Sequence, residues 1–241
     1  MATEETIKTN NQRIYEFGHR DGKELMLNDV ITSQEEFLEG KPQTHYDLFW
    51  DAFQSKGSAK SYYYAFSYNR FSDETFNPKY NIVCNSSGNA AQNLFYNSTL
   101  LTDTKVPIDV TRTNHIGGMC YGMTSLKTFN KLIIANNTTS GGNNAFYNCS
   151  ALENIVIEGE IAQNMNFQWS ILLSKASIKS IINTLSTTTE GLSVTFSEAA
   201  VNKAFETSGG LVDGSTSAEW IALAGNETTD GIRPKWNILL V

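Results

Sequence analysis

The 241-residue sequence is poor in the residues on which metal, disulfide and nucleic-acid chemistry depend. It has three histidines and three cysteines, with no CxxC pair and no His, Cys or carboxylate cluster at metal-ligand spacing. Its 18 Lys and Arg are scattered and outnumbered by 25 Asp and Glu, which gives a net charge of -7. Because phosphate contacts require clustered cations, we expect no nucleic-acid partner, and we also expect no metal and no cofactor.

Long apolar runs are also missing. No stretch approaches the roughly 18 apolar residues that a membrane-spanning helix needs. The first residues, MATEETIKTNNQ, have neither the basic region nor the apolar region of a secretory signal peptide. The sequence therefore predicts a protein without membrane insertion and without export by the usual signal.

Catalytic motifs are absent, since no GxSxG, Walker or GxGxxG pattern occurs. His115 and Cys120 could be considered a base and a nucleophile, but we expect Cys120 to be buried at a core position. Glu158 and Glu160 would share one side of an extended strand, and a solvated strand edge explains them more simply than a glycosidase pair. We expect a protein that is not an enzyme.

The cysteines themselves fit a packed core. Cys84, Cys120 and Cys149 are odd in number, so they cannot all pair within one chain. Free cysteine is among the most buried residue types, and two of the three fall at core positions of the repeat described next. We expect three reduced, packed thiols.

The sequence does have a phrase written four times. The copies are FYNSTLLTDTKVPIDV from Phe95, CYGMTSLKTFNKLIIA from Cys120, FYNCSALENIVIEG from Phe146 and FQWSILLSKASIKSII from Phe167, at offsets of 25, 26 and 21 residues. In the Phe146 copy the apolar residues come at steps of three and then of two, which is typical of a turn followed by a strand. The predicted core residues are Phe95, Leu101, Cys120, Met123, Leu126, Phe129, Phe146, Cys149, Leu152, Ile155, Ile157, Phe167, Leu173 and Ile178.

One such unit cannot bury its apolar side alone, so the units must stack strand beside strand. A period of 20 to 30 residues predicts an α/β repeat solenoid with a parallel sheet along one face and turn or helix connections. The Asn-rich and Gly-rich stretches between the copies supply tight corners, because both residues tolerate left-handed backbone.

The phrase AFYNCSALENIVI, Ala145 to Ile157, resembles the BspA-type leucine-rich repeat, whose AF-x-x-C-x-x-L-x-x-I-x-I core recurs in bacterial surface proteins and phage-encoded proteins. The match is looser from Cys120 to Ile134. It is degraded in the outer copies, where Ser98 and Ser170 occupy the third position. Residues 174–241 resemble the tail that follows such repeats in proteins encoded by phages and prophages of gut bacteria.

This resemblance implies a leucine-rich-repeat fold and a recognition role. One hypothesis is a tail or tail-tip protein of a phage virion, assembled in the bacterial cytoplasm, that presents the repeat surface to a glycan or protein of the host cell. The alternative is a bacterial surface adhesin that binds host protein or glycan. The missing export signal favours the virion.

The chain outside the repeats divides into three further segments. Residues 1–45 predict a polar helical segment that attaches to other virion proteins or to copies of itself. We expect an aromatic N-terminal cap at residues 46–80 and the solenoid at residues 81–190. We expect a C-terminal capping α/β segment at residues 191–241. We expect helices capped by Ser174 and Ser197, a capping box at Thr216 and Glu219, and strands at LSVTF and KWNILLV.

Aromatic residues crowd between Tyr46 and Tyr80. One interpretation is a cap in which large rings fill an irregular interface, with YYYAF as a strand that directs alternate rings inward. The other is a sugar-stacking platform. Its candidate ligand or receptor contacts are Trp50, Tyr62, Tyr63, Tyr64 and Tyr68.

Overall fold

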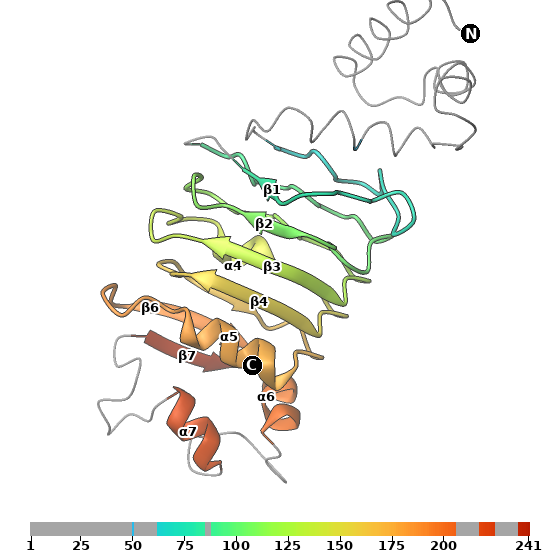
Figure 1. Cartoon of the computed structure of the whole chain (residues 1–241). Coiled ribbons are helices and arrows are strands. Elements are labelled where there is room, and N and C mark those ends of the chain that lie inside the picture. Colours follow the sequence, from blue (N-terminus) through green and yellow to red (C-terminus); the bar gives the residue numbers. More distant parts are fainter. Residues whose placement is uncertain (1–49, 51–61, 85–87, 206–216, 225–235) are drawn as a thin grey trace, which may run out of the picture. The chain divides into compact units, whose positions relative to one another are not determined.

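The computed structural model describes residues 50, 62–84, 88–205, 217–224 and 236–241 (Figure 1). The chain divides into two compact units, Met1–Lys56 and Gly57–Val241, and this division falls inside the predicted 46–80 segment. Trp50 is the one described residue of the first unit, so the helical attachment segment predicted for residues 1–45 lies outside the described residues. The fold below is that of the second unit.

Four parallel strands form the first sheet. They are β1 (Ile82–Val83), β2 (Pro107–Asp109), β3 (Thr128–Ile134) and β4 (Asn154–Gly159), and they pair in that order. The register aligns Ile82 with Ile108, Ile108 with Leu132, and Leu132 with Ile157, and all four side chains are buried. The predicted class is confirmed in its coarse form, which is α/β with parallel sheets and short helices.

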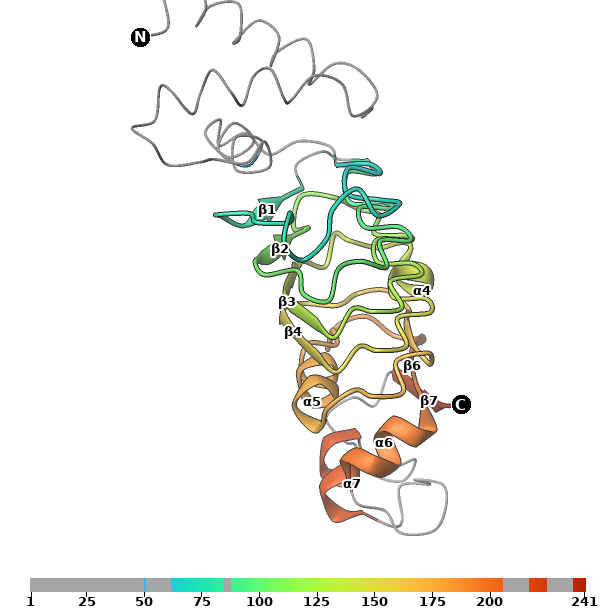
Figure 2. The same cartoon turned by 90° about the vertical axis from the view of Figure 1, so that its right-hand side faces the viewer.

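A turn segment precedes each strand, and we call one turn segment with its strand a layer. The turns lie on the side opposite the β1-β4 sheet, where Figure 2 shows the short helix α4 (Gly142–Ala145). Backbone hydrogen bonds join successive turns: Phe66 N–H donates to the carbonyl of Leu94 at 2.8 Å, and Phe95 N–H to Met119 at 2.8 Å. The layers therefore bond to one another on both sides of the core.

Predicted core residues at the same position of the repeated phrase lie in neighbouring layers. The carbonyl of Thr102 accepts from Lys127 N–H, and the carbonyl of Lys127 accepts from Glu153 N–H. The leucines immediately before these three residues, Leu101, Leu126 and Leu152, are each 0% exposed. Every predicted core residue is buried, with no more than 4% of its surface exposed.

Helix α5 (Lys175–Asn183) takes the place of a strand next to β4. Its N-cap is Ser174, whose side chain accepts from Ser177 N–H as predicted. The apolar stripe, Ile178, Ile181 and Ile182, is buried. Among the described residues α5 is the longest helix, and no helix there has the length and apolarity that crossing a membrane requires.

The second sheet is also parallel and has the order β5-β6-β7. Its strands are β5 (Met165–Phe167), β6 (Leu192–Phe196) and β7 (Trp236–Leu240), and the last two fall where the sequence predicts them. The rings of Phe146, Phe167 and Phe196 stack in sequence, at centroid distances of 5.1 and 6.1 Å. Phe167 of β5 and Phe196 of β6 therefore extend the buried core that begins at Phe146 in the preceding turn segment.

The two remaining helices are short, and the first of them confirms the predicted cap position at Ser197. Helix α6 (Glu198–Ala204) follows Ser197 as expected, without a hydrogen bond from that side chain. Helix α7 (Ala218–Ala224) is capped by Ser217, whose Oγ accepts from Trp220 N–H at 3.2 Å. Thr216 of the predicted capping box lies outside the described residues, and the Glu219 side chain forms ion pairs with Lys175 and Lys179 of α5.

The aromatic stretch YYYAF is a turn and not the predicted strand. Tyr64 has φ of 55° and Tyr68 has φ of 56°, both in the left-handed region, so the chain cannot stay extended there. The N–H groups of Tyr62, Tyr64, Phe66 and Tyr68 donate to carbonyls of residues 90–96 in the next layer. The stretch is one more turn segment stacked on the turn that contains Phe95.

Candidate recognition surface

The predicted contact residues separate by burial. Trp50 is 0% exposed and Tyr62 is 8% exposed, so neither presents a surface to a ligand and both assignments are corrected. Tyr63 and Tyr68 are 52% and 59% exposed, and Tyr64 is half-buried between them. Phe66, Phe71 and Phe76 are buried against one another, which is the packing expected of a cap.

A second aromatic feature, which we call the tyrosine ladder, was not found from the sequence. The rings of Tyr96, Tyr121 and Tyr147 stack at centroid distances of 4.9 and 4.7 Å, each pair tilted by 12°. Trp169 follows in the next layer, 5.6 Å from Tyr147 and at 61° to it. Tyr68 lies at the other end, 5.6 Å from Tyr96.

The ladder arises because three copies of the repeated phrase place Tyr directly after the first core residue. Each of these turn segments therefore places a tyrosine ring at the equivalent position, next to the tyrosine ring of the neighbouring layer. Both faces of Tyr121 are covered by the adjacent rings, so this side chain offers solvent only its edge and hydroxyl. At the end of the ladder Trp169 is 42% exposed. Recurrence of Tyr one residue after the phrase's first position was the available signal.

A hollow of about 330 Å³ adjoins the ladder. Three successive turn segments line it, so no single stretch of sequence forms it. Its side chains are those of Gln92, Asn93, Tyr96, His115, Tyr121 and Asn144. Aromatic edges and amide groups thus converge on one opening.

Glycines let successive layers approach closely around this hollow. A Cβ on Gly118, whose φ is +66°, would lie 2.0 Å from Oδ1 of Asn93. A Cβ on Gly141, whose φ is +90°, would lie 2.3 Å from the backbone nitrogen of Gly117. Side chains at these positions would collide with the neighbouring layer or require strained backbone. The His115 ring is held in place beside these glycines, because its Nδ1 accepts a hydrogen bond from Gly117 N–H at 3.0 Å.

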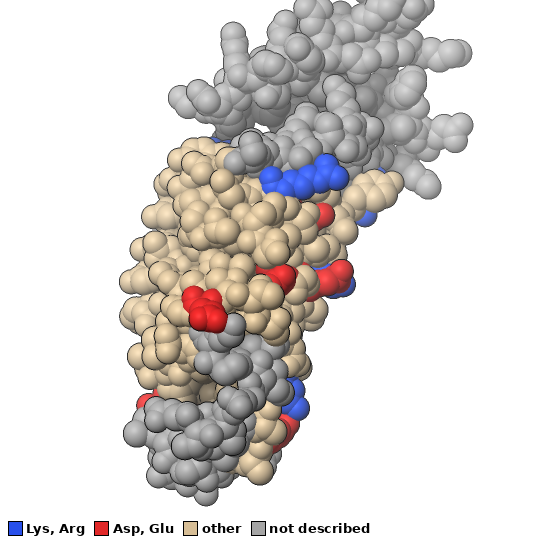
Figure 3. Space-filling view, turned by 90° about the vertical axis from the view of Figure 1, so that its left-hand side faces the viewer, with Lys and Arg blue, Asp and Glu red and all other residues tan. Residues whose placement is uncertain are grey.

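The turn side carries no formal charge over long stretches. Asp, Glu, Lys and Arg are absent from residues 88–101, 113–126, 135–152 and 161–174, which include the turn segments of four successive layers. In Figure 3 most charged side chains of the described surface lie toward the right, the side of the β1-β4 sheet, acidic groups also appear at the lower left, and the upper left is uncharged. Amide, hydroxyl and aromatic groups dominate there.

The three cysteines are free and buried, as the sequence predicts. Burial raises the pKa of the Cys84 and Cys149 thiols to about 12, and raises that of Cys120 well above its ordinary value. The Cys149 thiol donates to the carbonyl of Cys120 at 3.0 Å. A buried thiol that keeps its proton is inert, so none of the three has the character of a nucleophile.

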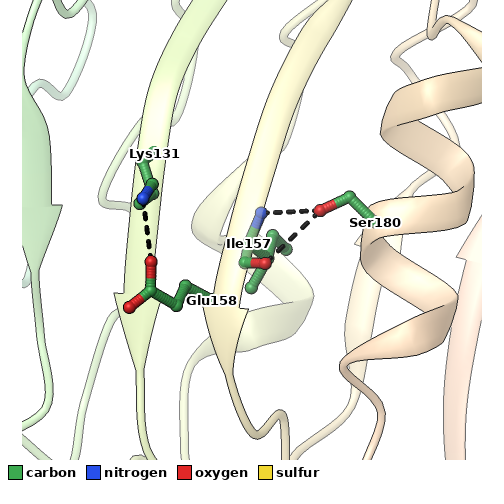
Figure 4. Close-up of polar contacts among 4 residues, drawn as sticks. All are labelled: Lys131, Ile157, Glu158 and Ser180. Carbon is green, nitrogen blue, oxygen red and sulfur yellow. Dashed lines mark hydrogen bonds and ion pairs between the residues drawn. The ribbon is translucent and has the colours of Figure 1, made fainter.

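The two carboxylates on the strand side have separate structural partners. Glu158 forms an ion pair with Lys131 at 2.8 Å, from the neighbouring strand (Figure 4). Glu160 accepts a hydrogen bond from Ser186. Within the described ranges no group of three His, Cys, Asp or Glu side chains could hold a metal ion.

No family model, no curated protein and no solved structure matches the chain. Its function is therefore argued from the residues and their arrangement.

Proposed function

We propose that the chain is a non-enzymatic recognition protein, a leucine-rich-repeat solenoid of the BspA type that presents its repeat surface to a host cell. In this proposal it is a tail or tail-tip component of a phage virion. Residues 1–45 attach it to other virion proteins or to sister chains, and the stacked turns contact a cell-surface receptor.

The observation that best supports a solenoid is that Leu101, Leu126 and Leu152 occupy equivalent buried positions in successive layers. These leucines are 25 and 26 residues apart, and each precedes a residue whose backbone bonds to the equivalent residue in the next layer. Such an interlocked arrangement makes a rigid surface from units that cannot fold singly. Binding surfaces of repeat proteins are built in this way, with side chains repeated at a fixed spacing.

A recognition role is also favoured by what the reactive side chains do. The thiols are buried and protonated, Glu158 pairs with Lys131, and Glu160 bonds to Ser186. Each candidate group from the sequence thus has a packing role or a structural partner. The phage context itself rests on the resemblance of residues 145–157 and 174–241 to phage-encoded repeat proteins.

Mass spectrometry of purified particles tests the virion assignment. Particles released from cells that encode this chain are banded on a density gradient, and its peptides are quantified across the gradient. We expect the chain to co-migrate with the particle peak in several copies per particle, while an abundant cytoplasmic enzyme does not. Absence from the peak would overturn the virion role, and recovery from the cell envelope would favour the adhesin instead.

A further inference from the structure

We propose that the hollow beside the tyrosine ladder binds an uncharged polysaccharide. The inference deepens the proposed recognition function and rests on it, since it assigns the ligand class of the same surface. It moves the contact site from the 62–68 stretch to three successive turn segments.

The first support is an amide in the wall of the hollow that makes no hydrogen bond within the described protein. Asn93 is 9% exposed and lines the hollow, and its side-chain amide bonds to no described residue. Its N–H groups and its carbonyl oxygen are therefore available to a ligand. The Asn93 amide faces a space large enough for a ligand hydroxyl.

The other polar groups around the hollow match the same chemistry. Because Nδ1 of His115 accepts from Gly117 N–H, the neutral ring carries its proton on Nε2 and can donate there. Gln92 and Asn144 add amides, which both donate and accept. Sugar hydroxyls also do both, so this set of groups fits a carbohydrate better than a ligand that only donates or only accepts.

Charge decides between sugar classes. Residues 88–101, 113–126 and 135–152 form the hollow and its surroundings without one Asp, Glu, Lys or Arg. A uronic acid, sialic acid or phosphorylated polymer would gain no ion pair there and would lose part of its hydration. An uncharged glycan lacks this penalty.

The tyrosine ladder extends from the hollow along the turn segments, so a long ligand could follow it. Tyr96 and Tyr121 belong both to the hollow and to the ladder, which continues through Tyr147 to Trp169. Tyrosine hydroxyls along the ladder can bond to successive sugars, and the 42% exposed indole of Trp169 is the ring available for stacking at its end. A polymer is therefore favoured over a single sugar.

The test is affinity electrophoresis of the full chain in gels that contain dextran, mannan or galactan, with alginate and hyaluronan as anionic comparisons. The decisive variant is Gln92→Ala with Asn144→Ala, which removes two amides at the hollow. The matched control is Asn143→Ala, because Asn143 is an exposed neighbour on α4 outside the hollow. Thermal unfolding of each variant shows whether the fold is intact.

We expect retardation by at least one uncharged polymer, a loss of about tenfold or more in affinity for the double variant, and parental affinity for Asn143→Ala. Raising NaCl from about 0.05 to 0.5 M should change the affinity less than about twofold, because no ion pair forms. Retardation by the anionic polymers alone, equal binding by the double variant, or no retardation in any gel overturns the proposal. If the chain still co-migrates with particles, the virion role survives that failure.

Discussion

The Oγ of Ser180 accepts a hydrogen bond from the backbone N–H of Ile157 at 2.8 Å, along the edge of β4 that no other described strand covers (Figure 4). One helical turn earlier, Ser177 Oγ accepts from Ile155 N–H at 2.9 Å. Helix α5 therefore satisfies alternate donors of the edge strand with side chains, in the place where another strand would use its carbonyls. Capping an edge in this way prevents it from pairing with a second chain.

Replacing Ser180 with Ala should lower the free energy of unfolding by about 1–2 kcal/mol, because the Ile157 N–H would lose its partner in a part-buried site. Chemical denaturation measures the change. Ser180→Thr retains a hydroxyl and should recover most of the stability. An Ala variant as stable as the parent would show that α5 does not close the edge.

Replacing Phe146 with Ala should cost roughly 3–5 kcal/mol, since the ring is 0% exposed and packs against Phe129 and Phe167. The same denaturation experiment applies, with exposed Asn143→Ala as the comparison. A loss below about 1 kcal/mol would contradict the inward register of the turn segments.

The native thiols should resist alkylation. Burial raises the pKa of Cys84 and Cys149 to about 12 and that of Cys120 well above its ordinary value, so almost no thiolate exists at pH 8. Iodoacetamide should label none of the three in the folded chain and all three in guanidinium chloride, as counted by intact mass. Rapid labelling of one native thiol would place that cysteine outside the core.

Tyr63 and Tyr62 form a matched pair for separating folding from binding. Tyr63 is 52% exposed, so Tyr63→Ala should alter unfolding by less than about 0.5 kcal/mol, whereas Tyr62→Ala removes a buried ring and should destabilise clearly. Glycan-array signal after Tyr63→Ala then reports on contact alone. An unchanged signal removes Tyr63 from the receptor surface.

The ion pairs between α5 and α7 should weaken as the pH falls. Hydrogen bonds from Lys179 and Lys175 lower the pKa of Glu219 below its ordinary value of 4.5. A lowered folded-state pKa means that this contact stabilises the fold above about pH 4.5 and is lost as the pH falls through the lowered value. Carboxyl NMR titration of Glu219 should show a midpoint below 4.5 that moves upward in Lys179→Ala. A midpoint at or above 4.5 in the parent chain would contradict the pairing.

Several elements could be predicted because apolar residues at a fixed spacing leave few arrangements. The cap at Ser174 with its stripe of isoleucines, the strand at LSVTF and the buried column through Leu101, Leu126 and Leu152 all follow from local pattern alone. The turn at Tyr62–Phe66 could not, because non-glycine residues seldom adopt left-handed φ. Tyr64 and Tyr68 are held there by hydrogen bonds to a layer almost 30 residues away.

By itself the sequence determined which side chains of the four repeated phrases are buried and which stretches carry no charge, since burial follows hydrophobicity and the residue types fix the charge. Tertiary structure alone decided that Tyr96, Tyr121 and Tyr147 stack and that Asn93, His115 and Asn144 share one hollow. The physical reason is that these groups are some 20 to 30 residues apart along the chain, and the backbone register between layers brings them within contact.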